Sequence, residues 1–91
     1  MANCIKAKIG DIVLIEWFDA TSYDEWSDHD HKVELARIIS CGIVNNIDFD
    51  RITLVLNRDM SNDGASLFMS IPFGMISRCK ILKRAKNDYF D

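Results

Sequence analysis

No stretch of this sequence is long and apolar enough to cross a membrane as a helix. The longest uninterrupted apolar run extends from Ile12 to Ile15 and is closed by Glu16, whereas a membrane span needs about 20 such residues. The first residues also lack a charged-then-apolar leader followed by a small-residue cleavage site. We therefore expect no membrane association and a cytoplasmic location.

Cysteine is scarce: the chain has three, at positions 4, 41 and 79, and no C-x-x-C pair. An odd number without that spacing is more typical of reduced thiols than of a disulfide framework or a zinc site. Cys41 falls within an apolar segment, where burial as a small hydrophobic residue is the common outcome. The two histidines lie far from every thiol in the sequence, so no cysteine nucleophile with an adjacent base is indicated.

Positive charge does not predominate. Eleven Lys and Arg against fourteen Asp and Glu leave a net charge of -3, which disfavours a polyanion such as nucleic acid as the partner. The chain contains neither a G-x-G-x-x-G nor a G-x-x-x-x-G-K-[ST] phosphate loop, so nucleotide hydrolysis is disfavoured as well.

Proline and glycine are also few, with one and four residues, and there is no repeat or low-complexity stretch. The sequence therefore predicts one domain over residues 1–91, with an ordered core of about residues 5–84. A domain of this size buries about 60 to 65% of the surface that its unfolded chain exposes. We expect self-association as one way to complete such a small core.

Apolar, β-branched and aromatic residues gather in five short segments separated by turn residues, a pattern typical of strands. These segments are residues 11–19, 38–44, 51–57, 66–71 and 76–82. The first is expected to be buried largely on both faces. Gly42 inside the second predicts a bulge or sharp bend, and Pro72 must end the fourth because proline cannot donate to a strand ladder.

A short helix is expected after the first strand. Ser27 followed by Asp30 is a typical helix start, and Val33, Leu35 and Ala36 would fill one or two turns. The fold class predicted is mainly β, a five-stranded, strongly bent small barrel with that one short helix.

A pattern of spaced single residues runs from about Gly10 to Leu82. It consists of Trp17, Asp19, Ala20, Trp26, residues 39–44, residues 50–54, Ile71, Pro72, Ile76, Ile81 and Leu82. This pattern resembles a group of small, mostly uncharacterised bacteriophage and prophage proteins. The resemblance implies a phage-encoded protein with an SH3-like or Sm-like five-strand barrel. It implies no catalytic residue, because that group has no agreed activity.

Aromatic and acidic side chains gather after the first strand. Tyr and Trp are enriched among interface hot spots, so we expect a partner-binding surface there, formed by Asp19, Tyr23, Asp24, Trp26 and Asp28. One alternative is that Trp26 only anchors this segment to the barrel. Another is that the acidic surface imitates DNA towards a host nuclease or repressor.

Two histidines among carboxylates raise the question of a metal site. His29 and His31 lie beside Asp24, Glu25 and Asp28, and imidazole with carboxylate is a ligand set for divalent metals. The two histidines point to opposite sides of a strand and diverge by about 200° on a helix. A solvated acidic loop is therefore favoured, and we expect neither a metal nor a cofactor.

The charges are distributed towards two ends of the sequence. Between Asp11 and Glu34 there are eight acids and one lysine, whereas the last strand and its exit, residues 78–86, carry five bases and no acid. Arg78, Lys80 and Arg84 are therefore candidates for binding an anion. Solvation, pairing within the subunit and a contact between subunits remain open for the same bases.

These patterns favour a protein that is not an enzyme. The expected function is a phage accessory binding module that self-associates and binds a host protein in the host bacterial cytoplasm, countering host defence. The alternative is an oligomeric sponge that sequesters an anionic, nucleotide-like signal molecule. A weak nucleic-acid-binding barrel comes third, because the net charge opposes it.

Overall fold

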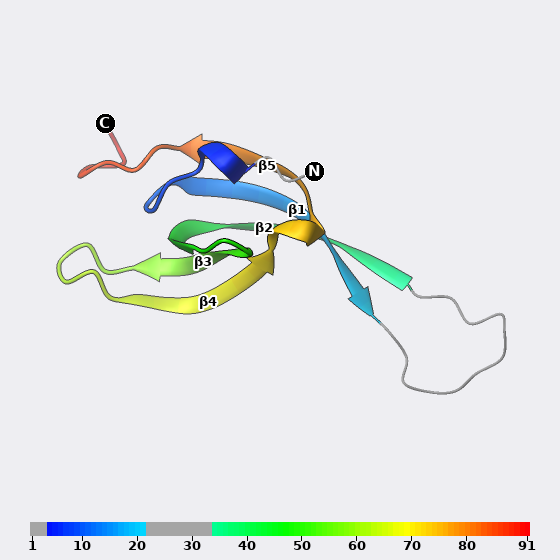
Figure 1. Ribbon diagram of the computed structural model, residues 1–91. Helices are drawn as coiled ribbons and strands as arrows, with labels where there is room; N and C mark the ends of the chain where they lie inside the picture. The colour runs from blue at the N-terminus through cyan, green and yellow to red at the C-terminus, as the bar shows by residue number, and fades with distance from the viewer. Residues whose placement is uncertain (1–3, 22–33) are drawn as a thin grey trace, which may run out of the picture.

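The computed structural model describes residues 4–21 and 34–91, which fold as one antiparallel sheet of five strands (Figure 1). The strands are β1 (Ile12–Thr21), β2 (Glu34–Ile47), β3 (Arg51–Arg58), β4 (Ala65–Pro72) and β5 (Ile76–Lys83). Two short 3-10 turns accompany them, η1 (Cys4–Lys6) before β1 and η2 (Phe73–Met75) between β4 and β5. The predicted mainly β class and the five strands are confirmed, and Pro72 does end β4.

The strands lie in the order β4-β3-β2-β1-β5, so β4 and β5 form the two edges of the sheet. A closed barrel would require β4 and β5 to be hydrogen-bonded neighbours. Instead, η2 carries the chain across the end of the sheet from one edge to the other (Figure 1). The expected closed barrel is therefore not formed, and the sheet is open.

The prediction of a helix after the first strand is wrong for its last three residues, 34–36, which belong to β2. Leu35 and Ala36 pair with Ala20 and Asp19 of β1. The β1–β2 ladder continues without interruption as far as Thr21 opposite Glu34. This pairing provides hydrogen-bond partners for backbone N–H and C=O groups that a single helical turn would leave unpaired. The rest of the predicted helix, residues 27–33, lies outside the described residues.

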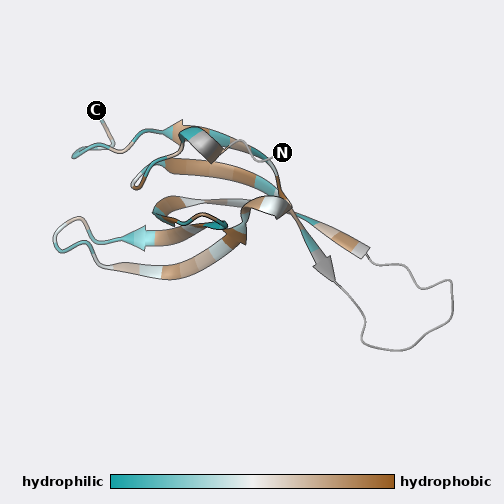
Figure 2. Cartoon of the chain, in the orientation of Figure 1, coloured by the Kyte–Doolittle hydropathy of each residue, from teal (hydrophilic) through white to brown (hydrophobic). Residues whose placement is uncertain are grey.

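The core lies on one face of the sheet. Val13 and Ile15 of β1 are fully buried, whereas Leu14 between them is 36% exposed on the opposite face. Ile52 and Ile71 face each other on β3 and β4 and are also fully buried. The core is completed by Cys4, Ala7, Val44, Leu54 and Ile76. Apolar residues run along β1 (Figure 2), yet this strand is fully buried on one face rather than on both.

Gly42 marks a close approach of two strands rather than the bulge itself. A Cβ atom at Gly42 would lie 3.0 Å from the carbonyl oxygen of Val55 and 3.1 Å from Cβ of Leu54. The bulge predicted there occurs slightly later, where the β2–β3 register shifts between Val44 and Asn46. An extra residue of this kind bends the bulged strand and increases its twist.

Cys4 and Cys79 form a disulfide that connects η1 to β5, with Cα atoms 5.4 Å apart. The expectation of three reduced thiols is therefore wrong. Because β5 pairs with β1, the segment that precedes β1 comes close to β5, which the spacing of the cysteines does not reveal. Cys41 is a free cysteine and is exposed rather than buried, because it lies opposite Leu14 on the sheet face that points away from the core.

Candidate functional site

An apolar cleft opens where β2 and β3 stop pairing. Within the described ladder, β2 pairs with β3 from Ile43 to Ile47, while the preceding half of β2 pairs with β1 and the last residues of β3 pair with β4. The two parts of the sheet leave a cavity of about 330 Å³ between them. This apolar cleft is lined by Ser40, Cys41, Leu54, Val55, Leu56, Leu67, Phe68 and Met69.

The apolar cleft has a buried base and an exposed rim. Leu54 and Val55 at the base are almost completely buried. Leu56, Leu67 and Phe68 at the rim are 61%, 65% and 60% exposed. Large apolar side chains gathered at one place are more informative than scattered ones, because contiguous apolar patches mark interaction surfaces.

A chain of hydrogen bonds holds one wall of the cleft in place. The indole Nε1 of Trp17 donates to Oγ of Ser40 at 3.0 Å, and this hydroxyl donates to Sδ of Met69 at 3.5 Å. The three residues belong to β1, β2 and β4, so the chain connects both parts of the sheet. It positions Met69, itself 44% exposed, before anything binds.

Strand β4 forms the outer side of the cleft and lacks the usual protection of an edge strand. The chain carries no charged residue between Asp63 and Arg78, and the residues from Ser66 to Ser70 are all exposed. Apolar colouring is concentrated along the middle of β4 in Figure 2. Natural edge strands are commonly shielded by charges, bulges or a covering element, because an open edge can pair with another chain.

Leu67 of β4 has a left-handed backbone conformation, with φ of 61°. This conformation costs roughly 1–2 kcal/mol for a residue with a Cβ atom. The side chain of Leu67 is exposed, so burial within the subunit does not offset this cost. Unusual backbone conformations of this kind occur preferentially at ligand-binding and switch regions.

A second cluster lies on the sheet face opposite the core and is centred on Glu16. Nε and Nη2 of Arg37 approach Oε2 of Glu16 at 2.6 and 2.5 Å. Nε of Arg78 lies 3.2 Å from Oε1, and its Nη2 donates to Oε2 at 3.3 Å. The hydrogen bond from Arg37 holds the pKa of Glu16 below its usual value against the opposing effect of burial, and Arg78 adds to the lowering. We call these three residues the Glu16 cluster.

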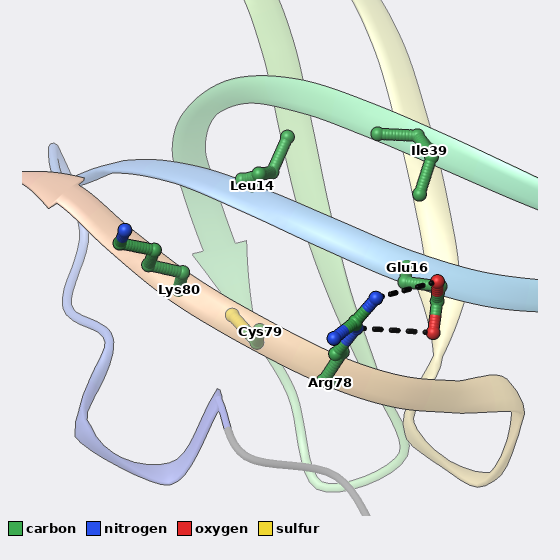
Figure 3. Close-up of a pocket in the computed structure, with 6 residues that line it drawn as sticks. All are labelled: Leu14, Glu16, Ile39, Arg78, Cys79 and Lys80. Atoms are coloured by element: carbon green, nitrogen blue, oxygen red, sulfur yellow. Dashed lines mark hydrogen bonds and ion pairs between the residues drawn. The ribbon is translucent and has the colours of Figure 1, made fainter.

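The strand register explains this cluster. Glu16 pairs directly with Arg78 on β5 and with Ile39 on β2, and Arg37 is the diagonal neighbour two positions from Ile39. Diagonal neighbours in a sheet are within reach of long side chains. A shallow pocket of about 310 Å³ lies beside the cluster (Figure 3), lined by Leu14, Glu16, Ile39, Arg78, Cys79 and Lys80.

The three bases proposed from the sequence as an anion site divide between two places. Arg78 and Lys80 line the same pocket. Arg84 instead lies beyond the end of β5, where its Nη1 donates to the carbonyl oxygen of Lys6 at 2.9 Å and to Oδ2 of Asp11 at 3.1 Å. Arg84 thus holds the N-terminal segment to the residues that follow β5.

The partner surface expected after the first strand is described only at its beginning. Asp19 is exposed on β1 and pairs with Ala36 of β2. Tyr23, Asp24, Trp26 and Asp28 lie outside the described residues, so this surface stays a prediction. The histidines and carboxylates considered as metal ligands also lie outside the described residues.

Sequence reasoning missed the cleft residues and Arg37. One signal for the cleft was present: three consecutive apolar residues, Leu67 to Met69, occupy a strand without any charge, so one of them must face away from the core. Arg37 gave no comparable signal, because its proximity to Glu16 depends on the pairing register of β1 and β2.

Within residues 4–21 and 34–91, no cluster of three or more His, Cys, Asp or Glu side chains is arranged to hold a metal ion. The same residues contain no helix of the length and apolarity needed to cross a membrane. No protein-family model, curated protein or solved structure matches this chain.

Proposed function

We propose that this chain is a non-enzymatic binding module whose binding surface is the outer edge of β4 together with the apolar cleft, and that a second copy of the chain occupies this surface. The observation that carries the proposal is the exposed, charge-free strand β4 (Ala65–Pro72) beside the cleft. The edge of such a strand presents N–H and C=O groups that can pair with another strand.

The size of the patch supports this proposal. The exposed parts of Leu56, Leu67, Phe68 and Met69 amount to on the order of 500 Å² of mostly apolar surface, near the upper end for the largest patch of a monomer. A stable interface covers about 800 Å² on each partner. Backbone pairing along β4 and the polar residues at its ends would supply the remainder.

A second copy suits this edge because β4 is compatible with itself. In a twofold antiparallel contact, the β4 strands of the two copies pair with each other. A charged residue in β4 would then lie near the same charge on the second copy and be repelled by it. β4 contains none, and Ser66 and Ser70 flank its three consecutive apolar residues, Leu67 to Met69. One twofold contact would pair the β4 edges of the two copies and bury Phe68 of each. No β4 edge would then be free to pair with a further copy.

The backbone at Leu67 supports the same surface. Its left-handed conformation brings an exposed leucine to the rim of the cleft at a free-energy cost. Burial of a leucine side chain contributes about 1.5–3 kcal/mol, enough to offset that cost once a second copy covers the side chain.

We further propose that the fold is an open form of the SH3-like or Sm-like architecture. The support is the antiparallel order β4-β3-β2-β1-β5, a bulge in β2 and the short 3-10 turn that links the two edge strands.

The proposal is tested by light scattering on the chromatographed protein over a range of concentrations. We expect a mass of twice 10.4 kDa for the unmodified protein and the monomer mass for Phe68→Asp. Phe49→Asp is the matched control, because Phe49 is 97% exposed in the turn between β2 and β3, and it should remain dimeric.

Two results would overturn the proposal. One is a monomer mass for the unmodified protein even at roughly millimolar concentration, which corresponds to about 4 kcal/mol of binding free energy. The other is a dimer that persists unchanged in Phe68→Asp. A complex with a different protein, lost in Phe68→Asp while the chain alone stays monomeric, would assign the surface to another occupant.

A further inference from the structure

The Glu16 cluster and the pocket beside it together carry an excess of positive charge. Arg37, Arg78 and Lys80 contribute three cationic groups on one face of β2 and β5, and Glu16 contributes one carboxylate. Two positive charges are therefore left over in a chain whose net charge is -3. Such a local excess favours a small anion although the whole molecule does not attract a polyanion.

Glu16 holds the two arginines side by side. Both guanidinium groups contact the same atom, Oε2 of Glu16, so they lie within hydrogen-bond reach of a single point. The Glu16 side chain is 9% exposed, whereas those of Arg37 and Arg78 are 58% and 70% exposed. The carboxylate thus lies beneath the guanidinium groups and offsets their mutual repulsion, while the arginines remain accessible to solvent.

The fixed guanidinium groups are suited to a ligand with several acceptor oxygens. A guanidinium group presents five N–H donors in a rigid plane, and those not directed at Glu16 are available for a carboxylate or phosphate. Lys80 lies two positions from Arg78 on the same face of β5 and lines the same pocket (Figure 3). Its ammonium group adds a point charge to this pocket.

Beside these charges the pocket offers an apolar wall. Leu14 of β1 and Ile39 of β2 are 36% and 52% exposed and line the same pocket. In Figure 3 their side chains lie on the neighbouring strands, across from Arg78 and Lys80. The volume of about 310 Å³ is at the lower end of the range for small-molecule sites. A ligand that fits combines an anionic group with a compact, largely apolar or planar body.

We propose that this pocket binds a small phosphate monoester. The phosphate group would contact Arg37, Arg78 and Lys80, and the body of the ligand would rest on Leu14 and Ile39. A phosphate monoester carries about -1.5 to -2 charges at pH 7, which matches the two positive charges left over among Glu16, the two arginines and Lys80. Arg84 is not part of this site, because it is bound to Asp11. The site lies away from the edge of β4 and does not depend on the proposed self-association.

The test is an NMR titration with adenosine 5′-monophosphate, inorganic phosphate and adenosine as separate probes. We expect saturable binding of the monophosphate with a Kd below about 1 mM, weaker binding of phosphate alone, and none of adenosine. Equal binding of phosphate and the monophosphate would assign the site to free phosphate and overturn the role of Leu14 and Ile39.

Single substitutions test which residues bind the phosphate group. Lys80→Gln leaves the Glu16 cluster intact, so its fold is expected to be preserved, and we expect at least about tenfold weaker binding of the monophosphate. Arg78→Gln, which removes one of the two guanidinium groups, should also weaken binding of the monophosphate. Arg51→Gln is the control, because Arg51 is an exposed arginine paired with Asp50 elsewhere on the sheet. Absence of saturable binding up to about 10 mM, or an equal loss in Arg51→Gln, would overturn the proposal.

Discussion

The backbone N–H of Ala85 donates a hydrogen bond of 2.8 Å to Oδ1 of Asp11, a residue 74 positions earlier in the chain. Oδ2 of the same carboxylate accepts from the backbone N–H of Lys8 at 2.9 Å and from Nη1 of Arg84. Asp11 is 1% exposed, so this one carboxylate joins the segment before β1 to the segment after β5. The hydroxyl of Tyr89 adds a hydrogen bond to the carbonyl oxygen of Gly10.

Replacing this carboxylate should lower stability. Asp11→Asn puts an amide NH₂ group where backbone donors now meet a carboxylate oxygen, and it removes the ion pair with Arg84. We expect a loss of about 1–3 kcal/mol in the free energy of unfolding, measured by urea unfolding at neutral pH. Asp19→Asn, at an exposed position of β1, should change it by less than about 0.5 kcal/mol. Equal effects of the two substitutions would contradict the role of Asp11.

The stability should also depend on Asp11 as the pH falls. Burial acts to raise the pKa of Asp11, but the N–H donors of Ala85 and Lys8 together with Arg84 outweigh it, so the pKa in the folded chain lies below the ordinary value of 3.8. The contribution is therefore fully present above that value and is lost as the pH falls towards the lower, folded-state pKa. The difference in stability between the unmodified protein and Asp11→Asn should shrink across this interval. A difference that stays constant would contradict the lowered pKa.

Reduction of the disulfide between Cys4 and Cys79 should destabilise the protein. The bond closes a loop with a sequence separation of 75, for which the chain-entropy model gives a stabilisation of about 4 kcal/mol. Urea unfolding with and without a reducing agent should show this loss in the unmodified protein and in Cys41→Ser. The double variant Cys4→Ser, Cys79→Ser should not respond. Three reactive thiols in the unfolded chain without a reducing agent, rather than one, would show that the bond is absent.

Gly42 should not tolerate a side chain. Because a Cβ atom there would meet the backbone oxygen of Val55, Gly42→Ala should force β2 and β3 apart and cost about 1–3 kcal/mol. Gly74 is the matched control, since a Cβ atom there would have no neighbour within 4 Å. Urea unfolding of both variants distinguishes crowding at Gly42 from a general effect of replacing glycine. Equal stability of the two variants would contradict the close approach.

The strands were predictable because alternation and β-branched residues act locally. Val13 and Ile15 in β1, and Ile52 and Leu54 in β3, follow the period of two and all lie in the core. Leu35 was not predictable in the same way. Its neighbours allow a helical turn, and only its pairing with Ala20 in the long β1–β2 ladder makes it a strand residue.

The candidate sites depended on pairings that the sequence does not display. Arg37 joins Arg78 at Glu16 because β2 and β5 flank β1 in a particular register, whereas Arg84, close to Arg78 in sequence, lies at another place. Cys4 and Cys79 meet for the same reason. The barrel is not closed, since β4 and β5 are the two edges of the sheet and are linked only by η2, and local propensity contains no information on which strands become edges.

The most direct test of the central claim, that β4 pairs with a second copy of the chain, is amide hydrogen exchange along β4 at several protein concentrations. Pairing predicts that outward-facing amides between Phe68 and Ile71 exchange more slowly as the concentration rises, and that Phe68→Asp removes this protection while Phe49→Asp keeps it. Exchange in β4 that is independent of concentration would contradict the account.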